Sequence, residues 1–382
     1  MFYSGMKESP RPTFIDLFAG IGGFHEAFKG LGAECKFVCE RDEAARTTYR
    51  AFHGESWGDE FLVNGPGIDH PPSFIRDITD LTLSRSDKLG NRGTRNIRRV
   101  MADFDVDILC GGFPCQPFSQ AGKRKGFDDE TRGTLFYDIC RIIRAKPPRA
   151  FFLENVRGIL TSGDVILDSE GEPLPYGSTL KTILDKLFSP VTAGGLGYHP
   201  PGGRSTKQRG KLGPSEVAPG VYLVKASDHG LPQNRQRVFI IGFRSSKEAK
   251  QMSLPLTVTL AQGGVSLADV LEVSKVFMNS RRDSERLMGF TLRCGGKRSP
   301  VSDRRNWDQY YVRTFEGEDI VLPLTQGAGL RLMGFPPERC FPEGVSYSQA
   351  MKQLGNSVAV PAVRDWGRQI LLAMGYEPKE EV

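Results

Sequence analysis

A single cysteine in this sequence stands where a nucleophile could act. Cys115 lies in the run 111–119, just after the apolar strand that we expect over 105–109. Pro114 and Pro117 flank it and restrict the backbone, which holds the side chain in place without a long loop. A thiolate presented in this way is a soft nucleophile, and basic neighbours increase its reactivity by lowering its pKa. Most lone cysteines are inert core residues; Cys115 differs because proline and glutamine surround it instead of apolar residues.

An acidic residue closes another expected strand. Glu154 follows the apolar run 149–153, and in a parallel sheet this position lies on the edge where ligands bind. A carboxyl group in such a cleft can hold or donate a proton if burial raises its pKa. Taken alone, the triplet Glu154-Asn155-Val156 favours a helix-capping or ion-paired acid.

A row of hydrogen-bond donors precedes a further strand. Gln233, Arg235 and Arg237 alternate just before 238–241, and on an extended segment the three side chains face one way. Such a row suits a nucleic-acid base and its phosphates. A solvated edge strand would have the same pattern.

A glycine-rich turn points to a cofactor. The run 16–24 places glycines between an expected strand and an expected helix, so that a ligand could approach the backbone closely. The spacing matches neither GxGxxG nor a phosphate-binding loop. Glu40 closes the next strand about 20 residues on, where a carboxylate commonly binds ribose hydroxyls. Asp77 could accept a hydrogen bond from an adenine amino group. Together these residues indicate a cofactor that contains an adenosyl group but no pyrophosphate. The alternative is a plain tight turn with solvated acidic side chains.

The elements that must position these residues alternate between strands and helices. Strands are expected at 13–18, 36–39, 105–109, 149–153 and 238–241, and helices at 24–30, 42–52, 135–144 and 361–374. This alternation is typical of βαβ units and predicts an α/β fold with a largely parallel sheet. Gly- and Pro-rich loops are expected over 57–73 and 190–220. The alternation stops after Phe243, so a second, smaller domain with a short helix at 267–273 is expected at 263–330.

Composition narrows the class of protein. Apolar residues make up 39% of the 382 residues, which excludes a mostly disordered chain, and no apolar run is long enough for a membrane helix. The first 12 residues lack the apolar core of a secretory signal. The 7 cysteines are an odd number without CxxC spacing, so we expect reduced thiols in a cytoplasmic compartment and no metal site.

The positive charge is unevenly distributed. The formal net charge is +6, and nine basic against four acidic residues fall between Arg281 and Arg313. Further basic stretches run over 85–99 and 123–125. No apolar face accompanies them, so a polyanion is a better partner than a membrane. On charge alone, a solvated basic surface explains the pattern equally well.

Five blocks of this sequence resemble, in the same order, the motifs of the C5-cytosine DNA methyltransferases. They are 16–28, Pro114-Cys115-Gln116, Glu154-Asn155-Val156, 233–237 and 353–358, and they span nearly the whole chain. The resemblance implies a Rossmann-like S-adenosylmethionine-dependent methyltransferase domain over 1–262 with 345–382, a hinge at 331–344 and a DNA target-recognition domain at 263–330. One position departs from the family pattern: Ala328 stands where a glutamate is usual, in the block before 331–336.

The resemblance also implies roles for individual residues. Cys115 would add to C6 of a flipped cytosine, Glu154 would engage N3, and Arg235 and Arg237 would hold the base and backbone. S-adenosylmethionine, released as S-adenosylhomocysteine, would bind at Phe18, Gly20, Gly22, Glu40, Asp77, Ile78, Pro114, Leu135, Asn356 and Val358. Substrate DNA would be contacted by Gln116, Gln233, Arg281, Arg293, Arg304 and Arg305. No metal is needed, and 120–132 would form a lid over the DNA.

The resemblance implies that the partner is double-stranded DNA and that the protein is a bacterial, cytoplasmic monomer. A restriction endonuclease could recognise the same DNA sequence. A tRNA cytosine is the alternative substrate, as in one branch of the family, and the arginine-rich region 263–330 favours DNA. A DNA-binding module with a relic cofactor fold is opposed by the joint presence of the four residues expected to be catalytic. An amino-methylating enzyme is opposed by Pro114-Cys115-Gln116, which stands in place of a polar-Pro-Pro-aromatic block.

Overall fold

The structure, a computed structural model, describes most of the chain. The described residues are 11–54, 74–83, 92–114, 135–203, 215–257, 264–277, 285–293 and 310–379. Several residues named above lie outside the described residues: Cys115, Gln116, Arg281, Arg304, Arg305 and the lid expected at 120–132. Within the described ranges, no helix combines the length and the apolar character needed to cross a membrane.

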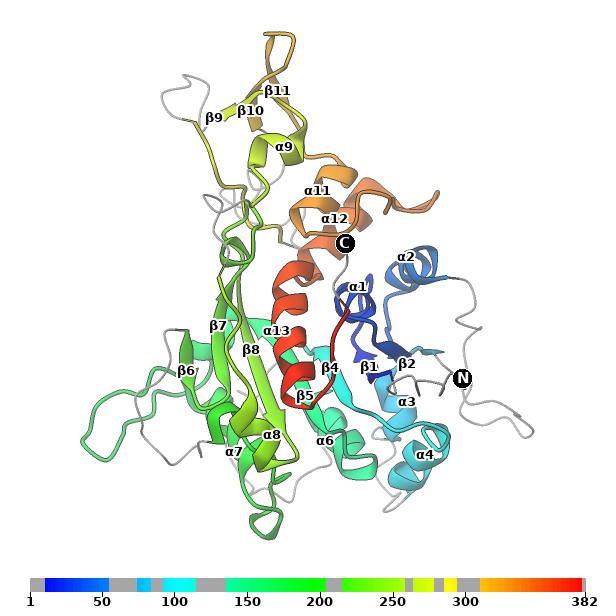
Figure 1. Ribbon diagram of the computed structural model, residues 1–382, viewed down its shortest axis with the longest axis vertical. Helices are drawn as coiled ribbons and strands as arrows, with labels where there is room; N and C mark the ends of the chain where they lie inside the picture. Colours follow the sequence, from blue (N-terminus) through cyan, green and yellow to red (C-terminus); the bar gives the residue numbers. More distant parts are fainter. Residues whose placement is uncertain are drawn as a thin grey trace, which may run out of the picture.

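An eight-stranded mixed sheet forms the centre of the molecule (Figure 1). Its order is β3-β2-β1-β4-β5-β8-β7-β6. The strands are β1 (Thr13–Leu17), β2 (Glu34–Cys39), β3 (Phe74–Ile75), β4 (Ile108–Gly112), β5 (Ala150–Val156), β6 (Glu216–Ala218), β7 (Val221–Lys225) and β8 (Gln236–Phe243). The strands from β3 to β5 pair in parallel, whereas β8, β7 and β6 pair antiparallel. The parallel half confirms the predicted Rossmann-like α/β fold, and its order reverses between β1 and β4, where sheets of this kind bind ligands.

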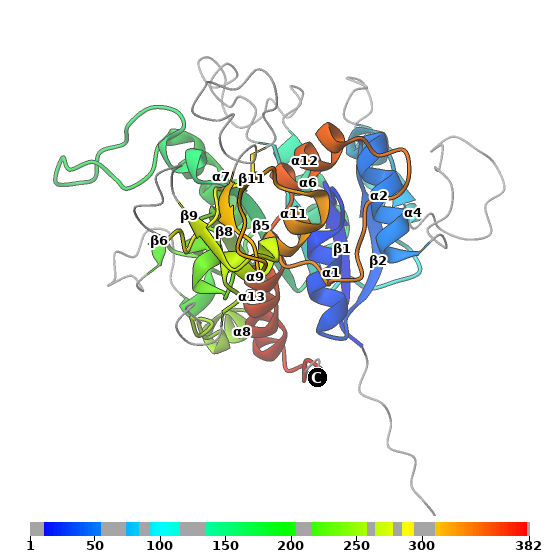
Figure 2. The same cartoon turned by 90° about the horizontal axis from the view of Figure 1, so that it is seen from above.

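Helices cover both faces of this sheet (Figure 2). They are α1 (Gly23–Gly30), α2 (Glu43–His53), α3 (Ile78–Thr82), α4 (Arg92–Val100), α6 (Leu135–Ala145), α7 (Ser178–Phe188), α8 (Ser246–Gln251) and α13 (Val360–Ala373). Phe14 and Phe152 pack into the core that contains residues of α1, α8 and α13. Their chain neighbours Ile15 and Leu153 pack into the core that contains residues of α4, α6 and α7. The two-residue period of a strand therefore fills both cores from the same strands.

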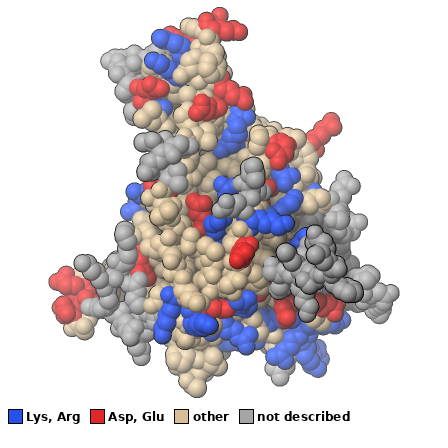
Figure 3. Space-filling view, viewed as in Figure 1, with Lys and Arg blue, Asp and Glu red and all other residues tan. Residues whose placement is uncertain are grey.

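Parts of this architecture differ from the sequence-based expectation. Residues 92–100 form helix α4, in which Ile97 and Val100 are buried while the four arginines are exposed. Lys and Arg side chains gather at the lower right of Figure 3, the part of the molecule where Figure 1 draws α4. Helix α7 and strands β6 and β7 are also unpredicted, and β6 lies within the expected loop 190–220. Strand β4 starts at Ile108 instead of residue 105, and before it the Asp107 carboxylate accepts the backbone N–H of Thr13 at 2.8 Å.

A second, three-stranded antiparallel sheet lies at the top of Figure 1. Its strands are β9 (Lys275–Phe277), β10 (Tyr310–Arg313) and β11 (Asp319–Leu322), accompanied by the helices α9 (Leu267–Leu271), α11 (Gln326–Leu332) and α12 (Tyr347–Asn356). The whole sheet falls within 263–330, and the boundaries of that domain stay a prediction. Ala328 is buried in α11, where its N–H donates to the Thr325 hydroxyl that caps the helix.

A buried polar cluster lies beneath the glycine turn that follows β1. The rings of His25 and His53 stack with centroids 4.0 Å apart, and His25 Nδ1 is hydrogen-bonded to the Tyr49 hydroxyl. His53 Nδ1 lies 3.9 Å from Glu26, whose carboxylate accepts from Arg339 at 2.8 Å. Burial lowers the pKa of His25 to about 3 and the pKa of His53 to about 2. Both imidazoles are therefore neutral in the folded protein at neutral pH.

These lowered pKa values predict a loss of stability in mild acid. An unfolded histidine has a pKa of about 6.5, so below that pH the unfolded chain binds protons that the folded chain does not. Each buried histidine should cost about 1.4 kcal/mol of stability per pH unit below that value, or about 2 kcal/mol at pH 5. In urea unfolding, His53→Phe should lose about 2 kcal/mol less stability than the wild type between pH 7 and pH 5. Equal losses in the two proteins would show that His53 does not take up a proton on unfolding.

Candidate active site

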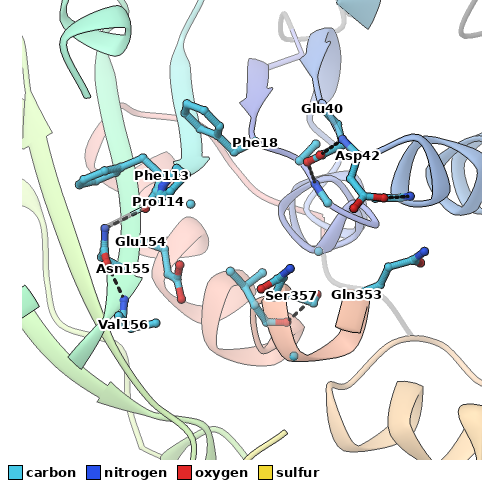
Figure 4. Close-up of a pocket in the computed structure, with 18 of the residues that line it drawn as sticks. Phe18, Glu40, Asp42, Phe113, Pro114, Glu154, Asn155, Val156, Gln353 and Ser357 are labelled. Atoms are coloured by element: carbon cyan, nitrogen blue, oxygen red, sulfur yellow. Dashed lines mark hydrogen bonds between the residues drawn. The ribbon is translucent and has the colours of Figure 1, made fainter. Parts of the chain in front are cut away.

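A cavity of about 1510 Å³ opens at the carboxyl ends of β1, β2, β4 and β5 (Figure 4). The end of α12 and residues 291–293 form its other walls. Its volume exceeds the roughly 300–1,000 Å³ typical of a site for one small ligand. Most of the site residues expected from sequence line it: Phe18, Gly20, Glu40, Asp77, Ile78, Pro114, Leu135, Glu154, Arg237, Arg293, Asn356 and Val358.

The turn after β1 presents open backbone to the cavity. Phe18 and Gly20 both have φ +58°, and Gly22 has φ +84°, so the chain reverses within a few residues. A Cβ on Gly22 would lie 2.1 Å from His53 Nε2, so the Cα of Gly22 packs against the protein interior, and Gly22 does not line the cavity. A Cβ on Gly20 would meet no protein atom within 4 Å. Gly20 is therefore the member of the turn that leaves room for a ligand.

Gly20→Ala tests whether a ligand occupies that room. The substitution places a methyl group in the cavity and also strains the backbone, because φ at this position is positive. Gly171→Ala is the matched control, since Gly171 has φ +85° and open space around it but does not line the cavity. By calorimetry we expect Gly20→Ala to weaken binding of S-adenosylhomocysteine about tenfold, or about 1.4 kcal/mol, and Gly171→Ala to leave it unchanged. Unchanged affinity in both variants would place the ligand away from this turn.

Two carboxylates line the same end of the cavity. Glu40 Oε2 accepts the Gly20 backbone N–H at 2.8 Å and Oε1 accepts the Asp42 N–H at 2.6 Å, which orients the side chain (Figure 4). Burial raises the pKa of the Glu40 carboxyl above its ordinary value. Asp77 Oδ1 caps α3 by accepting the Thr79 N–H at 2.9 Å. A carboxylate has about four lone-pair sites, so Glu40 can accept ribose hydroxyls in addition to the two amides.

The C-terminal block forms a wall beside the glycine turn. Asn356 is exposed at the cavity, and Val358 is buried so close to Gly23 that a Cβ there would lie 2.6 Å from its Cγ2. Gln353 accepts a hydrogen bond from Thr48 of α2 at 2.8 Å, across 305 residues of sequence. These contacts hold the C-terminal wall at a fixed distance from the turn after β1.

Strand register brings Pro114 close to Glu154. Gly112 at the end of β4 pairs with Glu154 in β5, and Pro114 follows at the cavity. The Asn155 side chain donates to the Phe113 carbonyl at 2.9 Å, which holds the backbone just before Pro114 (Figure 4). No role is predicted from sequence for Asn155, although a buried amide within the Glu154 triplet is a usable signal. Cys115 is the next residue along the chain from Pro114 and lies outside the described residues.

Glu154 is a buried acid with a cation beside it. Arg237 Nε lies 2.7 Å from Glu154 Oε1, an ion pair whose N–H is not aligned for a hydrogen bond. Burial raises the pKa of the Glu154 carboxyl above its ordinary value, and the charges of Arg237 and Arg235 offset part of the rise. A carboxyl group in this environment can hold a proton at neutral pH more readily than a solvated one.

Gln233 and Arg235 lie outside the cavity lining. The two side chains are 0% and 1% exposed, and their polar atoms bind backbone groups of other segments. The expectation that Gln233, Arg235 and Arg237 face one way toward a base is therefore not met, because only Arg237 lines the cavity. Strand β8 begins at Gln236, so the two earlier residues lie in a junction between segments and not on a strand edge.

Comparisons with known proteins agree on one family. The family model for C-5 cytosine-specific DNA methylase matches residues 12–69 and 83–280. The Type II methyltransferase M.HpaII of Haemophilus parainfluenzae is 34% identical over 395 residues, covering 95% of this chain and 90% of that protein. The Type II methyltransferase M1.ScrFI of Lactococcus lactis subsp. cremoris is 33% identical over 387 residues, covering 96% of this chain and 79% of that protein.

Solved structures show the same fold at lower identity. The S. pombe Dnmt2 methyltransferase has a TM-score of 0.58 and 15% identity, over 96% of this chain and 100% of that chain. A Spodoptera frugiperda DNMT2 mutant has a TM-score of 0.54 and 16% identity, over 94% and 99% of the two chains. At these identities the likeness concerns the fold alone.

Proposed function

Because the chain belongs to the family of C-5 cytosine-specific DNA methylases, we propose that it methylates C5 of a cytosine within a specific duplex sequence, with S-adenosylmethionine as methyl donor. Membership makes the chain an enzyme, a DNA (cytosine-5) methyltransferase. The observation that supports this proposal is one cavity that is lined by Gly20, Glu40 and Asp77 at one end and also by Glu154 and Arg237, which form an ion pair. Its volume suits a cofactor beside an extruded nucleotide.

The residues at one end of the cavity fit S-adenosylmethionine. Gly20 leaves an open backbone face, and Glu40 has lone pairs for ribose hydroxyls. Asp77 and Ile78 would hold the adenine, while Phe18, Pro114, Leu135, Asn356 and Val358 would enclose the rest of the molecule. When bound, S-adenosylmethionine supplies a methyl group on a sulfonium sulfur.

Cys115 is the nucleophile in this proposal. C5 of cytosine is a poor carbon nucleophile, and addition of the Cys115 thiolate to C6 forms a C–S bond that makes C5 enamine-like. Glu154 holds the proton that N3 gains in this step, which its raised pKa supports. Once C5 carries the methyl group, a water removes the C5 proton, the C–S bond breaks and the thiolate returns. Arg237, beside Glu154, holds the base during these steps.

The substrate in this proposal is duplex DNA. The reacting carbon lies inside the base stack, so the nucleotide must flip into the cavity at a cost of a few kcal/mol. The region 263–330 contains the small sheet and contributes the exposed Arg293 to the cavity wall, which supports a role in recognition. Relatives that are Type II methyltransferases support a restriction-modification pair with an endonuclease of matching specificity.

Bisulfite sequencing of DNA from a host that expresses the chain tests the proposal. We expect cytosines to be protected in one short sequence context, and none to be protected in a host that expresses Cys115→Ser. A chimera that carries residues 263–330 of a relative should protect a different context; an unchanged context would remove recognition from that region. Absence of protection in DNA, together with tritium transfer to tRNA, would overturn DNA as the substrate.

A further inference from the structure

One buried arginine is bonded to two walls of the cavity. Arg235 is 1% exposed, and its guanidinium donates to the backbone carbonyls of Leu292 at 2.6 Å, Gly355 at 2.8 Å and Ser357 at 2.5 Å. Leu292 belongs to the wall at 291–293, and Gly355 and Ser357 belong to the wall at the end of α12. The three carbonyls lie 57, 120 and 122 residues from Arg235 in sequence. A single side chain therefore joins segments that no local structure holds together.

Gln233 makes a second set of bonds across the same junction. Its side-chain amide donates to the Leu332 carbonyl at 2.9 Å, and its side-chain oxygen accepts the Leu292 N–H at 3.1 Å. Its backbone forms a parallel bridge with Gly289. Gln233 thus binds Leu292 at the N–H while Arg235 binds it at the carbonyl. Residues 289–292 must consequently move with the segment that precedes β8.

We infer that Arg235 is a positioning residue that couples DNA binding to cofactor binding. The inference rests on the proposed function, because it takes 291–293 as the DNA side of the cavity and 355–358 as the cofactor side. A guanidinium is planar and its donors have a fixed geometry, so the three carbonyls cannot shift independently without loss of charge-assisted hydrogen bonds. A ligand that orders one wall then lowers the cost of ordering the other, and by linkage the effect is reciprocal.

The test compares Arg235→Lys with a matched control, Arg331→Lys. Lysine keeps the positive charge but replaces the planar guanidinium, whose N–H donors have a fixed geometry, by a single ammonium group. Arg331 also donates to a backbone carbonyl, that of Val270 at 2.8 Å, yet it does not line the cavity. Calorimetry measures the Kd of S-adenosylhomocysteine with and without sheared, unmethylated bacterial DNA. DNA should tighten binding by on the order of fivefold or more in the wild type and in Arg331→Lys, and should leave the Kd nearly unchanged in Arg235→Lys.

Hydrogen exchange on the ligand-free proteins provides a second readout. Arg235→Lys should raise amide exchange in 289–293 and in 354–358 together, whereas Arg331→Lys should raise it in neither segment. The inference would be overturned if DNA tightened the binding of S-adenosylhomocysteine to Arg235→Lys as much as it does for the wild type. It would also be overturned if amide exchange rose in only one of the two segments. If Arg235→Lys does not fold, Gln233→Met takes its place; this substitution removes the side-chain bonds to Leu292, Leu332 and Met333 and should weaken the coupling. Full coupling in Gln233→Met would overturn the inference.

The wild type separates this inference from the proposed function. A wild-type protein that methylates DNA but binds DNA and S-adenosylhomocysteine independently would overturn the coupling and leave the proposed function intact. A wild-type protein that binds neither and transfers no methyl group would overturn both.

Discussion

Replacing Cys115 with serine is expected to abolish methyl transfer while DNA binding stays measurable. A serine hydroxyl ionises far less readily than a thiol, so it cannot add to C6 at a useful rate. Loss of the nucleophile should lower kcat by on the order of 10⁴-fold or more. A tritium-transfer assay measures the rate, and filter binding on the same DNA measures the affinity, which we expect to remain near that of the wild type.

The control for this variant is Cys340→Ser. Cys340 is an exposed free thiol that does not line the cavity, so the control removes a cysteine without touching the proposed chemistry. It should retain wild-type kcat. A duplex that contains 5-fluorocytosine should trap a covalent adduct with the wild type and with Cys340→Ser, but not with Cys115→Ser. Turnover near the wild-type rate in Cys115→Ser would contradict the covalent mechanism.

A second large effect is expected at Glu154. Glu154→Gln keeps the size of the side chain but cannot hold the proton at N3, so kcat should fall by about 10²–10⁴-fold. Affinity for S-adenosylhomocysteine should stay unchanged, because Glu154 and Glu40 lie on different sides of the cavity (Figure 4). Burial raises the pKa of Glu154, so the protonated carboxyl persists to higher pH and is lost as the pH rises through that value. Glu154→Gln should therefore remove the alkaline limb of the kcat profile.

Glu26→Gln distinguishes proton transfer from the mere loss of a buried ion pair. Glu26, like Glu154, is an acid whose pKa is raised by burial and whose neighbour is an arginine, with Arg339 at 2.8 Å. Glu26 does not line the cavity, so its variant should keep kcat. Equal losses of kcat in the two variants would mean that Glu154 acts through folding alone.

The elements that the sequence predicts well are those with a strong local pattern. The strand and helix around the glycine turn, expected at 13–18 and 24–30, are Thr13–Leu17 and Gly23–Gly30. The C-terminal helix, expected at 361–374, is Val360–Ala373, with Pro361 in the first turn. In each case the apolar residues repeat with the period of the element, and a glycine or proline marks its end within a few residues. Because Phe18 follows the first of these elements and Val358 precedes the last, the position of these two cavity residues could be predicted from the sequence.

The features that the sequence does not predict depend on partners far away in the chain. Strands β6 and β7 are short; β7 pairs with β8 and β6 pairs with β7, and no local pattern specifies this pairing. Arg235 and Arg237 have the same residue type and lie two positions apart, yet one is enclosed by distant carbonyls and the other faces Glu154. Spacing alone cannot separate these two environments. The cofactor residues, the nucleophile and the domain boundaries stay predictions.

The direction of β8 separates the cavity from the small sheet along the chain. Since β8 runs antiparallel to β5, it enters the sheet at the cavity edge and leaves at the far edge. The chain then passes through α8 and a long connection before it reaches the small sheet at the other end of the molecule (Figure 1). Insertions or deletions there leave the strands that carry Glu154 and Arg237 in place. If the small sheet reads the target sequence, as the proposed function holds, an engineer could lengthen, trim or graft it to retarget the enzyme while the strands that carry Glu154 and Arg237 stay as they are.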